Sequence, residues 1–167
     1  MTRREHLATI SVVAAHALFS DVLAAFARAA AAPDVWRPEA VAPEQGPLLA
    51  EVVDTILPAT DTPGAKAARV HMFVDLALAR CVPAAARAAV VSALRPLGAA
   101  YLTAAPDARR ARLAQIDAAP LALLQELTIL GYFTSEIGAT QALAYDAAPS
   151  GYRGCVPLVP GQKAWAT

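Results

Sequence analysis

The chain has 167 residues and a formal net charge of zero, and 57% of its residues are hydrophobic against only 17% that are charged. This length predicts a single domain with one sizeable core. The balanced charge argues against a nucleic-acid partner, and no uncharged apolar window reaches the roughly 18 residues of a spanning helix. The low share of charged residues indicates either a surface that a partner covers or an N-terminal segment that is not part of the core.

Residues 1–32 predict either an export signal or a retained helix. Arg3 and Arg4 stand shortly before an uncharged stretch at residues 7–20, and this pattern is typical of a twin-arginine export signal. His6 departs from it, because a large apolar residue is usual there. The alternative is an amphipathic helix, since apolar residues recur at i, i+3, i+4 and i+7: Phe19, Val22, Leu23 and Phe26. Both hold if the signal is read and then kept as a helix.

Residues 33–146 predict an all-α domain of about five to seven helices. The first apolar stripe stops at Pro58 and comprises Leu48, Leu49, Val52, Val53, Ile56 and Leu57. A second stripe comprises Val70, Phe73, Val74, Ala77, Leu78 and Cys81. A third is expected to break at Pro96 and comprises Val90, Leu94, Leu97 and Tyr101. The last follows Pro120 and comprises Leu123, Leu124, Leu127, Leu130 and Phe133. Between these, Asp107 should cap a short helix whose arginines lie in solvent.

The stretch TILPATDTPGAKAARVHMFVD, residues 55–75, holds many polar groups between two apolar runs. It could be an active-site loop, a phosphate-binding turn or a junction between helices. We interpret it as a rigid interhelical corner made by Pro58, Thr60, Asp61, Thr62, Pro63 and Gly64. The threonine and aspartate oxygens should cap the next helix, Pro63 suits a first helical turn, and Gly64 permits close approach of backbone. Lys66 and Arg69 should face outward.

A stripe of small residues in ELTILGYFTSEIGATQALAY, residues 126–145, falls at i, i+4, i+7 and i+11, and comprises Gly131, Ser135, Gly138 and Ala142. This spacing places them on one face of a helix. Glycine inside a helix costs about 1 kcal/mol relative to alanine, so the stripe predicts tight helix packing or a local break. Glu136 has no second carboxylate or base near it in sequence, which favours a capping or ion-pair role over a catalytic one.

Residues 147–167 are rich in proline and glycine, too irregular for a helix and too aromatic for a plain disordered tail. We expect an extended docking tail, whose apolar side chains lie on the helical domain, on another subunit, or on both: Tyr152, Val156, Leu158 and Trp165. In a cytosolic protein Cys81 and Cys155 would be free thiols. In an exported protein an even number of cysteines favours a disulfide, here closing a loop of about 75 residues and contributing roughly 4 kcal/mol.

The sequence offers no convergent chemistry. It has no His-x-x-x-His or Cys-x-x-Cys spacing for a metal and no glycine-rich nucleotide loop, so no catalytic, metal or cofactor-binding residue is assigned. His71 is expected to be partly exposed rather than a general base. The rival enzyme hypothesis requires four groups to meet in space: Asp61, Lys66, His71 and Glu136.

Three separated blocks, ILPATDTPGAKAARVHMFVD, GYFTSEIGATQALAY and the closing GYRGCVPL with its later AW, resemble the gluconate 2-dehydrogenase subunit 3 family. The paired arginines at the start are similar as well. The resemblance spans most of residues 48–165. It implies a small, non-catalytic subunit of a periplasmic or membrane-associated sugar dehydrogenase.

In such complexes, the resemblance implies, a large subunit of the glucose–methanol–choline type holds FAD and the substrate. A cytochrome c subunit carrying haem c often passes the electrons on. The small subunit would assist folding of the large one and take it through the twin-arginine pathway, either staying bound or leaving after export. We therefore expect no cofactor in this chain, and periplasmic localisation.

Overall fold

The computed structural model describes residues 36–148, 151, 157 and 159–166, and in this part of the chain it is helical with no β-strand. The α-helices are α2 (Gly46–Ile56), α3 (Val70–Arg80), α4 (Ala84–Leu94), α5 (Gly98–Leu102), α6 (Pro106–Leu113) and α7 (Ala118–Phe133). The short turns are η1 (Pro43–Gln45), η2 (Arg95–Leu97) and the π-helical η3 (Gly138–Ala142). The all-α prediction is confirmed.

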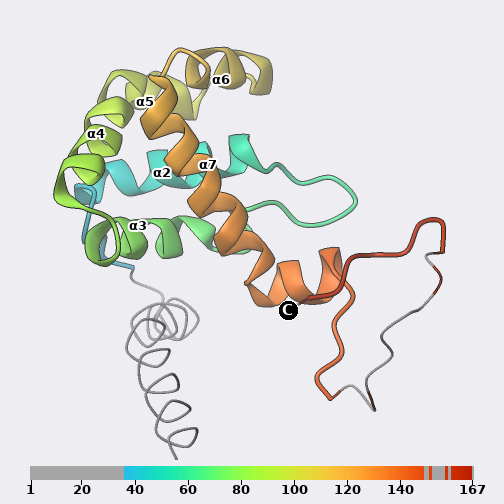
Figure 1. Ribbon diagram of the computed structural model, residues 1–167. Coiled ribbons are helices and arrows are strands. Elements are labelled where there is room, and N and C mark those ends of the chain that lie inside the picture. The colour runs from blue at the N-terminus through green and yellow to red at the C-terminus, as the bar shows by residue number, and fades with distance from the viewer. Residues whose placement is uncertain (1–35, 149–150, 152–156, 158, 167) are drawn as a thin grey trace, which may run out of the picture.

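Helix α7 organises the domain: it lies diagonally across α2, α3 and α4 and contacts all three (Figure 1). Its inward residues Leu124 and Leu127 are buried together with the stripes predicted for the other helices. The fully buried large side chains of that core are Leu49, Val52, Val53, Val70, Val74, Leu78, Val90, Leu94 and Tyr101. The predicted interruption near Pro96 is confirmed, because η2 separates α4 from α5.

Two expectations for these helices are wrong. Asp107 does not cap α6: the N-cap is Ala105, which makes no side-chain cap, and Asp107 instead pairs with Arg110 within the helix. The arginines of α6 are not all in solvent, since Arg109 reaches across to α2 and α5. In the second stripe, Cys81 is exposed because α3 ends at Arg80.

The end of α7 also differs from the prediction. The predicted face of small residues is broken, since α7 ends at Phe133 and η3 begins only at Gly138. At the break the Ser135 hydroxyl donates to the Tyr132 carbonyl at 2.6 Å and accepts from the Gly138 N–H at 3.0 Å. Such side-chain bonds compete with the helical ladder. Of the two outcomes expected for this stripe, Gly131 shows tight packing and residues 134–135 show the local break.

Candidate functional site

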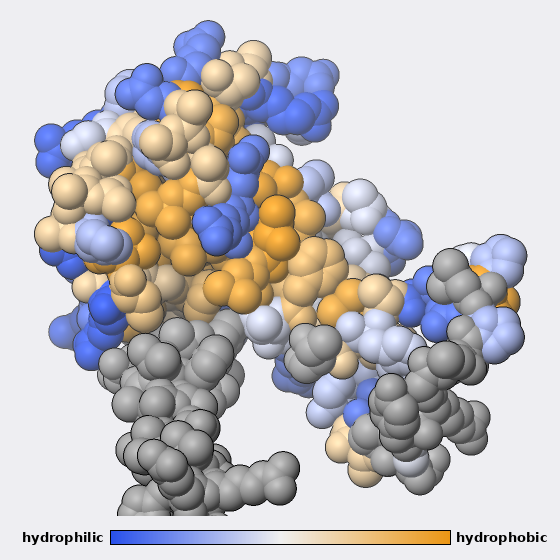
Figure 2. All heavy atoms as spheres, viewed as in Figure 1, coloured by the Kyte–Doolittle hydropathy of each residue, from blue (hydrophilic) through white to orange (hydrophobic). Residues whose placement is uncertain are grey.

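The exposed large apolar side chains of the described residues all belong to the C-terminal quarter of the chain: Ile129, Leu130, Phe133, Tyr145, Val159 and Trp165. In Figure 2 apolar surface gathers over the region where α7 crosses the domain. Leu130 and Phe133 were expected on the buried side of α7, but their exposed fractions are 45% and 37%. We call Ile129, Leu130 and Phe133 the apolar stripe of α7.

The inner side of the same helix is packed as closely as backbone allows. A Cβ atom at Gly131 would lie 2.5 Å from Cδ1 of Phe73 and 3.0 Å from Cγ1 of Val70. Helix α7 is therefore apolar both towards α3 and towards solvent. An exposed apolar stripe on a helix that is already packed on its inner side marks a candidate contact surface.

A pocket of about 350 Å³ lies beside the end of this stripe, between the start of α3 and the break after α7. Its lining combines an apolar floor with two charged residues: Ala67, Ala68, Arg69, Val70, Phe73, Gly131, Thr134, Ser135, Glu136 and Ile137. A second hollow of about 620 Å³ lies near the other end of α7, where Pro120 lines it. No large exposed apolar side chain of the described residues adjoins the second hollow.

The loop between α2 and α3, residues 57–69, contains the predicted interhelical corner and is hydrogen-bonded to α7. The Tyr132 hydroxyl donates to the Pro63 carbonyl at 2.7 Å and lies 3.3 Å from the Thr62 hydroxyl. At Gly64 a Cβ atom would lie 2.7 Å from both the Ala59 nitrogen and Oδ1 of Asp54, so backbone approaches closely there. Helix α2 ends at Ile56, Leu57 is its C-cap, and Pro58 follows directly.

The capping role predicted for the corner is wrong. Helix α3 begins only at Val70, and its N-cap is Arg69, which makes no side-chain cap. The Thr60 hydroxyl donates to the neighbouring Asp61 carboxylate at 2.8 Å instead. Pro63 likewise lies outside α3, before a single turn in which the Ala68 N–H bonds the Gly64 carbonyl at 3.1 Å. The polar groups hold the loop itself rather than the following helix.

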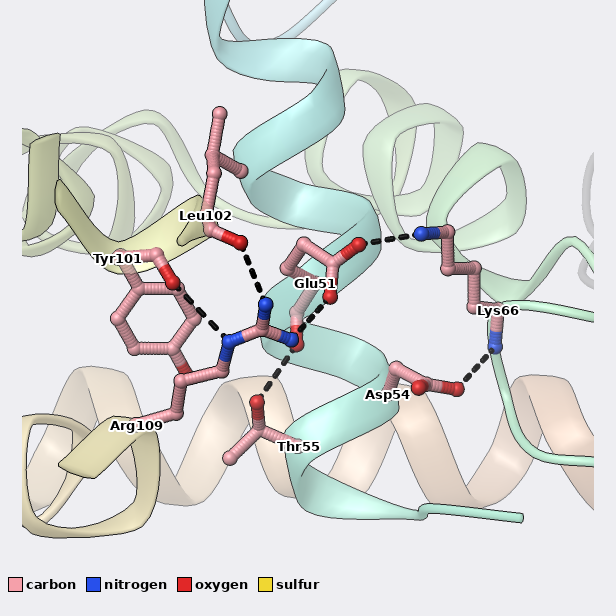
Figure 3. Close-up of polar contacts among 7 residues, drawn as sticks. All are labelled: Glu51, Asp54, Thr55, Lys66, Tyr101, Leu102 and Arg109. Carbon is pink, nitrogen blue, oxygen red and sulfur yellow. Dashed lines mark hydrogen bonds and ion pairs between the residues drawn. The ribbon is translucent and has the colours of Figure 1, made fainter. Parts of the chain in front are cut away.

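An ionic cluster that the sequence did not reveal centres on Glu51 of α2 (Figure 3). Its carboxylate pairs with Lys66 of the corner and Arg109 of α6, and Arg109 also donates to the Tyr101 carbonyl at 3.0 Å and the Leu102 carbonyl. Partial burial would raise the pKa of Glu51, but the two cations outweigh it and hold the pKa below its usual range. The cluster joins four segments, namely α2, the corner, α5 and α6.

The chain entering the domain is clasped by Asp75 of α3. This carboxylate is 1% exposed and accepts from the backbone N–H groups of Glu39, Ala40 and Val41 at 2.7, 2.9 and 3.1 Å. Burial raises its pKa, although the three N–H donors act in the opposite direction. Glu39 also pairs with Arg80 at 2.8 Å. We call these contacts the N-terminal clasp.

His71 lies beside the clasp and is partly buried. The ring of Trp36 meets it edge-on, with 5.0 Å between centroids. Burial, together with the nearby charges of Lys66 and Arg69, lowers the pKa of His71 to about 4. Its Nδ1 atom is buried and has no hydrogen-bond partner in the described part of the chain. At neutral pH this imidazole is therefore uncharged, and it packs against Trp36.

The four residues of the rival enzyme hypothesis make their contacts in different places. Asp61 is exposed and bonded to Thr60, Lys66 pairs with Glu51, His71 packs on Trp36, and Glu136 lines the pocket after α7. Among the described residues no group of three or more histidine, cysteine, aspartate or glutamate side chains is placed to hold a metal ion.

Much of the predicted tail lies outside the described residues, namely Tyr152, Cys155, Val156 and Leu158, as do Arg3 and Arg4. Trp165 is described and 62% exposed. Its segment pairs with Ala144, whose N–H donates to the Ala164 carbonyl at 2.8 Å and whose carbonyl accepts from Ala166 at 2.8 Å. Cys81 is exposed and forms no disulfide within the described part of the chain; since Cys155 is not described, the disulfide stays a prediction.

A sequence model of the gluconate 2-dehydrogenase subunit 3 family matches residues 43–150, well over half of the chain. The chain belongs to this family. No curated protein and no solved structure matches it. The family takes its name from one subunit of an oxidoreductase, so the chain is a subunit-type protein whose family implies partner subunits.

The subunit 3 match includes the corner at residues 57–69, the apolar stripe of α7 and the pocket between them. Two of the three sequence blocks that suggested the family therefore meet in space, through the Tyr132–Pro63 hydrogen bond and the packing of Gly131 on Val70 and Phe73. None of the described helices of this subunit 3 chain has the length and apolar character to cross a membrane.

Proposed function

We propose that the chain is the non-catalytic small subunit of a periplasmic, FAD-dependent sugar dehydrogenase of the glucose–methanol–choline type. The observation that carries the proposal is membership of the subunit 3 family over residues 43–150. In this proposal the chain assists folding of the catalytic flavoprotein, brings it through the twin-arginine pathway by its N-terminal segment, and remains bound to it. FAD belongs to the flavoprotein, and haem c to a cytochrome partner.

The distribution of apolar surface supports a lasting complex. The apolar stripe of α7 exposes three large side chains. After it, Tyr145 and Trp165 are 58% and 62% exposed. Permanent interfaces are apolar and bury about 2,000 Å² or more, and aromatic side chains often anchor them. A subunit that left its partner after export would expose this surface to water.

Co-expression tests the proposal. The proposed flavoprotein partner is produced with and without this chain, and soluble protein, FAD absorbance and sugar oxidation are measured. We expect at least a tenfold loss of soluble, FAD-loaded enzyme without the chain. Equal yield and activity in both preparations would refute the folding role.

Size-exclusion chromatography of the exported material tests whether the subunit is retained. Co-elution of the chain with the flavoprotein is expected. Separate elution, with the flavoprotein still active, would identify a chaperone that is released after translocation and would contradict a permanent complex. Turnover of sugar by the isolated chain would instead support an independent enzyme.

A further inference from the structure

We propose that the pocket between residues 67–70 and 131–137 receives one large apolar side chain of the catalytic flavoprotein, carried on a segment with an acidic and a basic residue beside it. This inference rests on the proposed function, to which it adds the place and the chemistry of the central contact. The occupant follows from the shape of the pocket, its charges and its position at the end of the apolar stripe.

The shape suits a single large side chain. The floor is apolar and comprises Val70, Phe73 and Gly131, and the pocket has a volume of about 350 Å³. A dry apolar cavity of roughly 150 Å³ already accepts a benzene ring, so a leucine, methionine or phenylalanine enters with room for its own backbone to approach. Gly131 lets α7 lie close against Phe73 at this floor, because a Cβ atom there would lie 2.5 Å from Cδ1 of Phe73.

One wall is held in an unusual backbone conformation. Arg69 has φ 55° and ψ 27°, in the left-handed region, and is the one non-glycine residue of the described chain with positive φ. Such a conformation costs about 1 kcal/mol or more and persists where the surroundings impose it, often at binding sites. Here it ends the turn after Gly64 and starts α3, placing residues 67–69 along the pocket.

Two opposite charges line the pocket. Arg69 and Glu136 are both exposed, and neither forms an ion pair with another described residue. Unpaired charges of opposite sign fix the register of a bound segment and disfavour wrong partners. An acidic residue facing Arg69 and a basic residue facing Glu136 complement them.

The pocket continues the exposed apolar stripe. Thr134 lines the pocket and lies one helical turn after Leu130, to whose carbonyl its N–H donates at 3.1 Å. Residues one turn apart share a helix face, so a surface that covers Leu130 also reaches the pocket. Protein interfaces concentrate their binding energy in a few buried anchor side chains surrounded by less sensitive contacts. We therefore expect the subunit that covers the apolar stripe to place such an anchor in the pocket.

A pair of alanine substitutions tests this assignment. Ala67 is exposed and lines the pocket, whereas Ala85 is also exposed but lies on α4 and does not line the pocket. Ala67→Trp fills the mouth of the pocket, and Ala85→Trp adds the same bulk elsewhere. We expect at least a tenfold loss of co-purifying, FAD-containing flavoprotein with Ala67→Trp and no loss with Ala85→Trp, while circular dichroism shows that both variants stay folded.

A photo-crosslinking residue at position 67 supplies a second readout that does not depend on filling the pocket. It should cross-link to an apolar residue of the flavoprotein, and the same group at position 85 should not. Equal complex yield for both tryptophan variants, or pocket binding of a small molecule that leaves the complex intact, would overturn the inference. If even the unmodified chain fails to co-purify, the proposed function itself is wrong.

Discussion

Residues 36–128 and the described part of residues 129–166 differ in how completely they bury their large apolar side chains. In the first region none of the described large apolar side chains is exposed, and its surface alanines and charges face water. In the second, six of the described large apolar side chains are exposed, and the helix is broken after Phe133. The first region therefore completes its own core, whereas the described part of the second leaves apolar surface uncovered, as the proposed contact with a partner subunit requires.

The largest effect should come from breaking the first region at Asp75. Asp75→Ala leaves three backbone N–H groups without their acceptor, one of them buried and two partly buried, and a buried unsatisfied group costs about 1–3 kcal/mol. We expect a loss of about 4 kcal/mol in the free energy of unfolding, measured in urea. Asp107→Ala is the control, because its side chain is 90% exposed and pairs only at the surface; a similar loss there would contradict the clasp.

A pH titration should give the next largest effect. The pKa of His71 is about 4 in the folded chain against 6.5 for the unperturbed group. Between these values the unfolded chain binds more protons, so stability falls as the pH falls from 6.5 to 4. The shift corresponds to about 3 kcal/mol. We expect His71→Gln to remove most of this slope in urea denaturation at several pH values.

Two carboxylates modify that titration with opposite signs. The lowered pKa of Glu51 adds stability above its ordinary pKa of 4.5, which is lost as the pH falls through the folded value. The raised pKa of Asp75 acts the other way, because its contribution declines as the pH rises above 3.8. Identical slopes for the original chain and His71→Gln would show that His71 is not enclosed.

Gly131→Ala tests the boundary between the regions. Helix propensity alone predicts a gain of about 1 kcal/mol, whereas the new Cβ atom would meet Phe73 at 2.5 Å. Overpacking typically costs 1–3 kcal/mol, so we expect a net loss of about 1–2 kcal/mol in thermal or urea unfolding. A stabilised variant would mean that α7 can move away from α3 freely.

The smallest effect on folding should come from Leu130→Ala, in the second region. Leu130 is 45% exposed, so its removal should change the free energy of unfolding by less than about 1 kcal/mol. Leu124→Ala on the same helix is the matched comparison, because Leu124 is fully buried and its loss should cost about 2–5 kcal/mol. Equal losses would erase the distinction between the two regions.

Local pattern predicted the helices well. The stripe from Leu48 to Val53 needs only a 3.6-residue period, and Pro58 marks its end through its missing N–H and its ring. The family resemblance also rested on blocks that are contiguous in sequence. These features depend on near neighbours, which a sequence displays directly.

Long-range contacts escaped prediction. Thr60, Asp61 and Thr62 have the chemistry of helix caps, but Tyr132, about 70 residues away, fixes the corner instead. Glu51 and Arg109 are 58 residues apart, so no short sequence spacing predicts their ion pair. Leu130 and Phe133 match a helical period whichever side of α7 is covered, so only the positions of α2, α3 and α4 decide that they stay exposed.

The N-terminal clasp also has a mechanical consequence. A pull on the chain ahead of Trp36 reaches the domain at Asp75 in the middle of α3, because Glu39, Ala40 and Val41 bind that one carboxylate. All three hydrogen bonds end on that one carboxylate, and the Glu39–Arg80 pair adds a second point of attachment. Traction applied at this end is thus transmitted to a helix packed against α7, rather than fraying the domain from its edge.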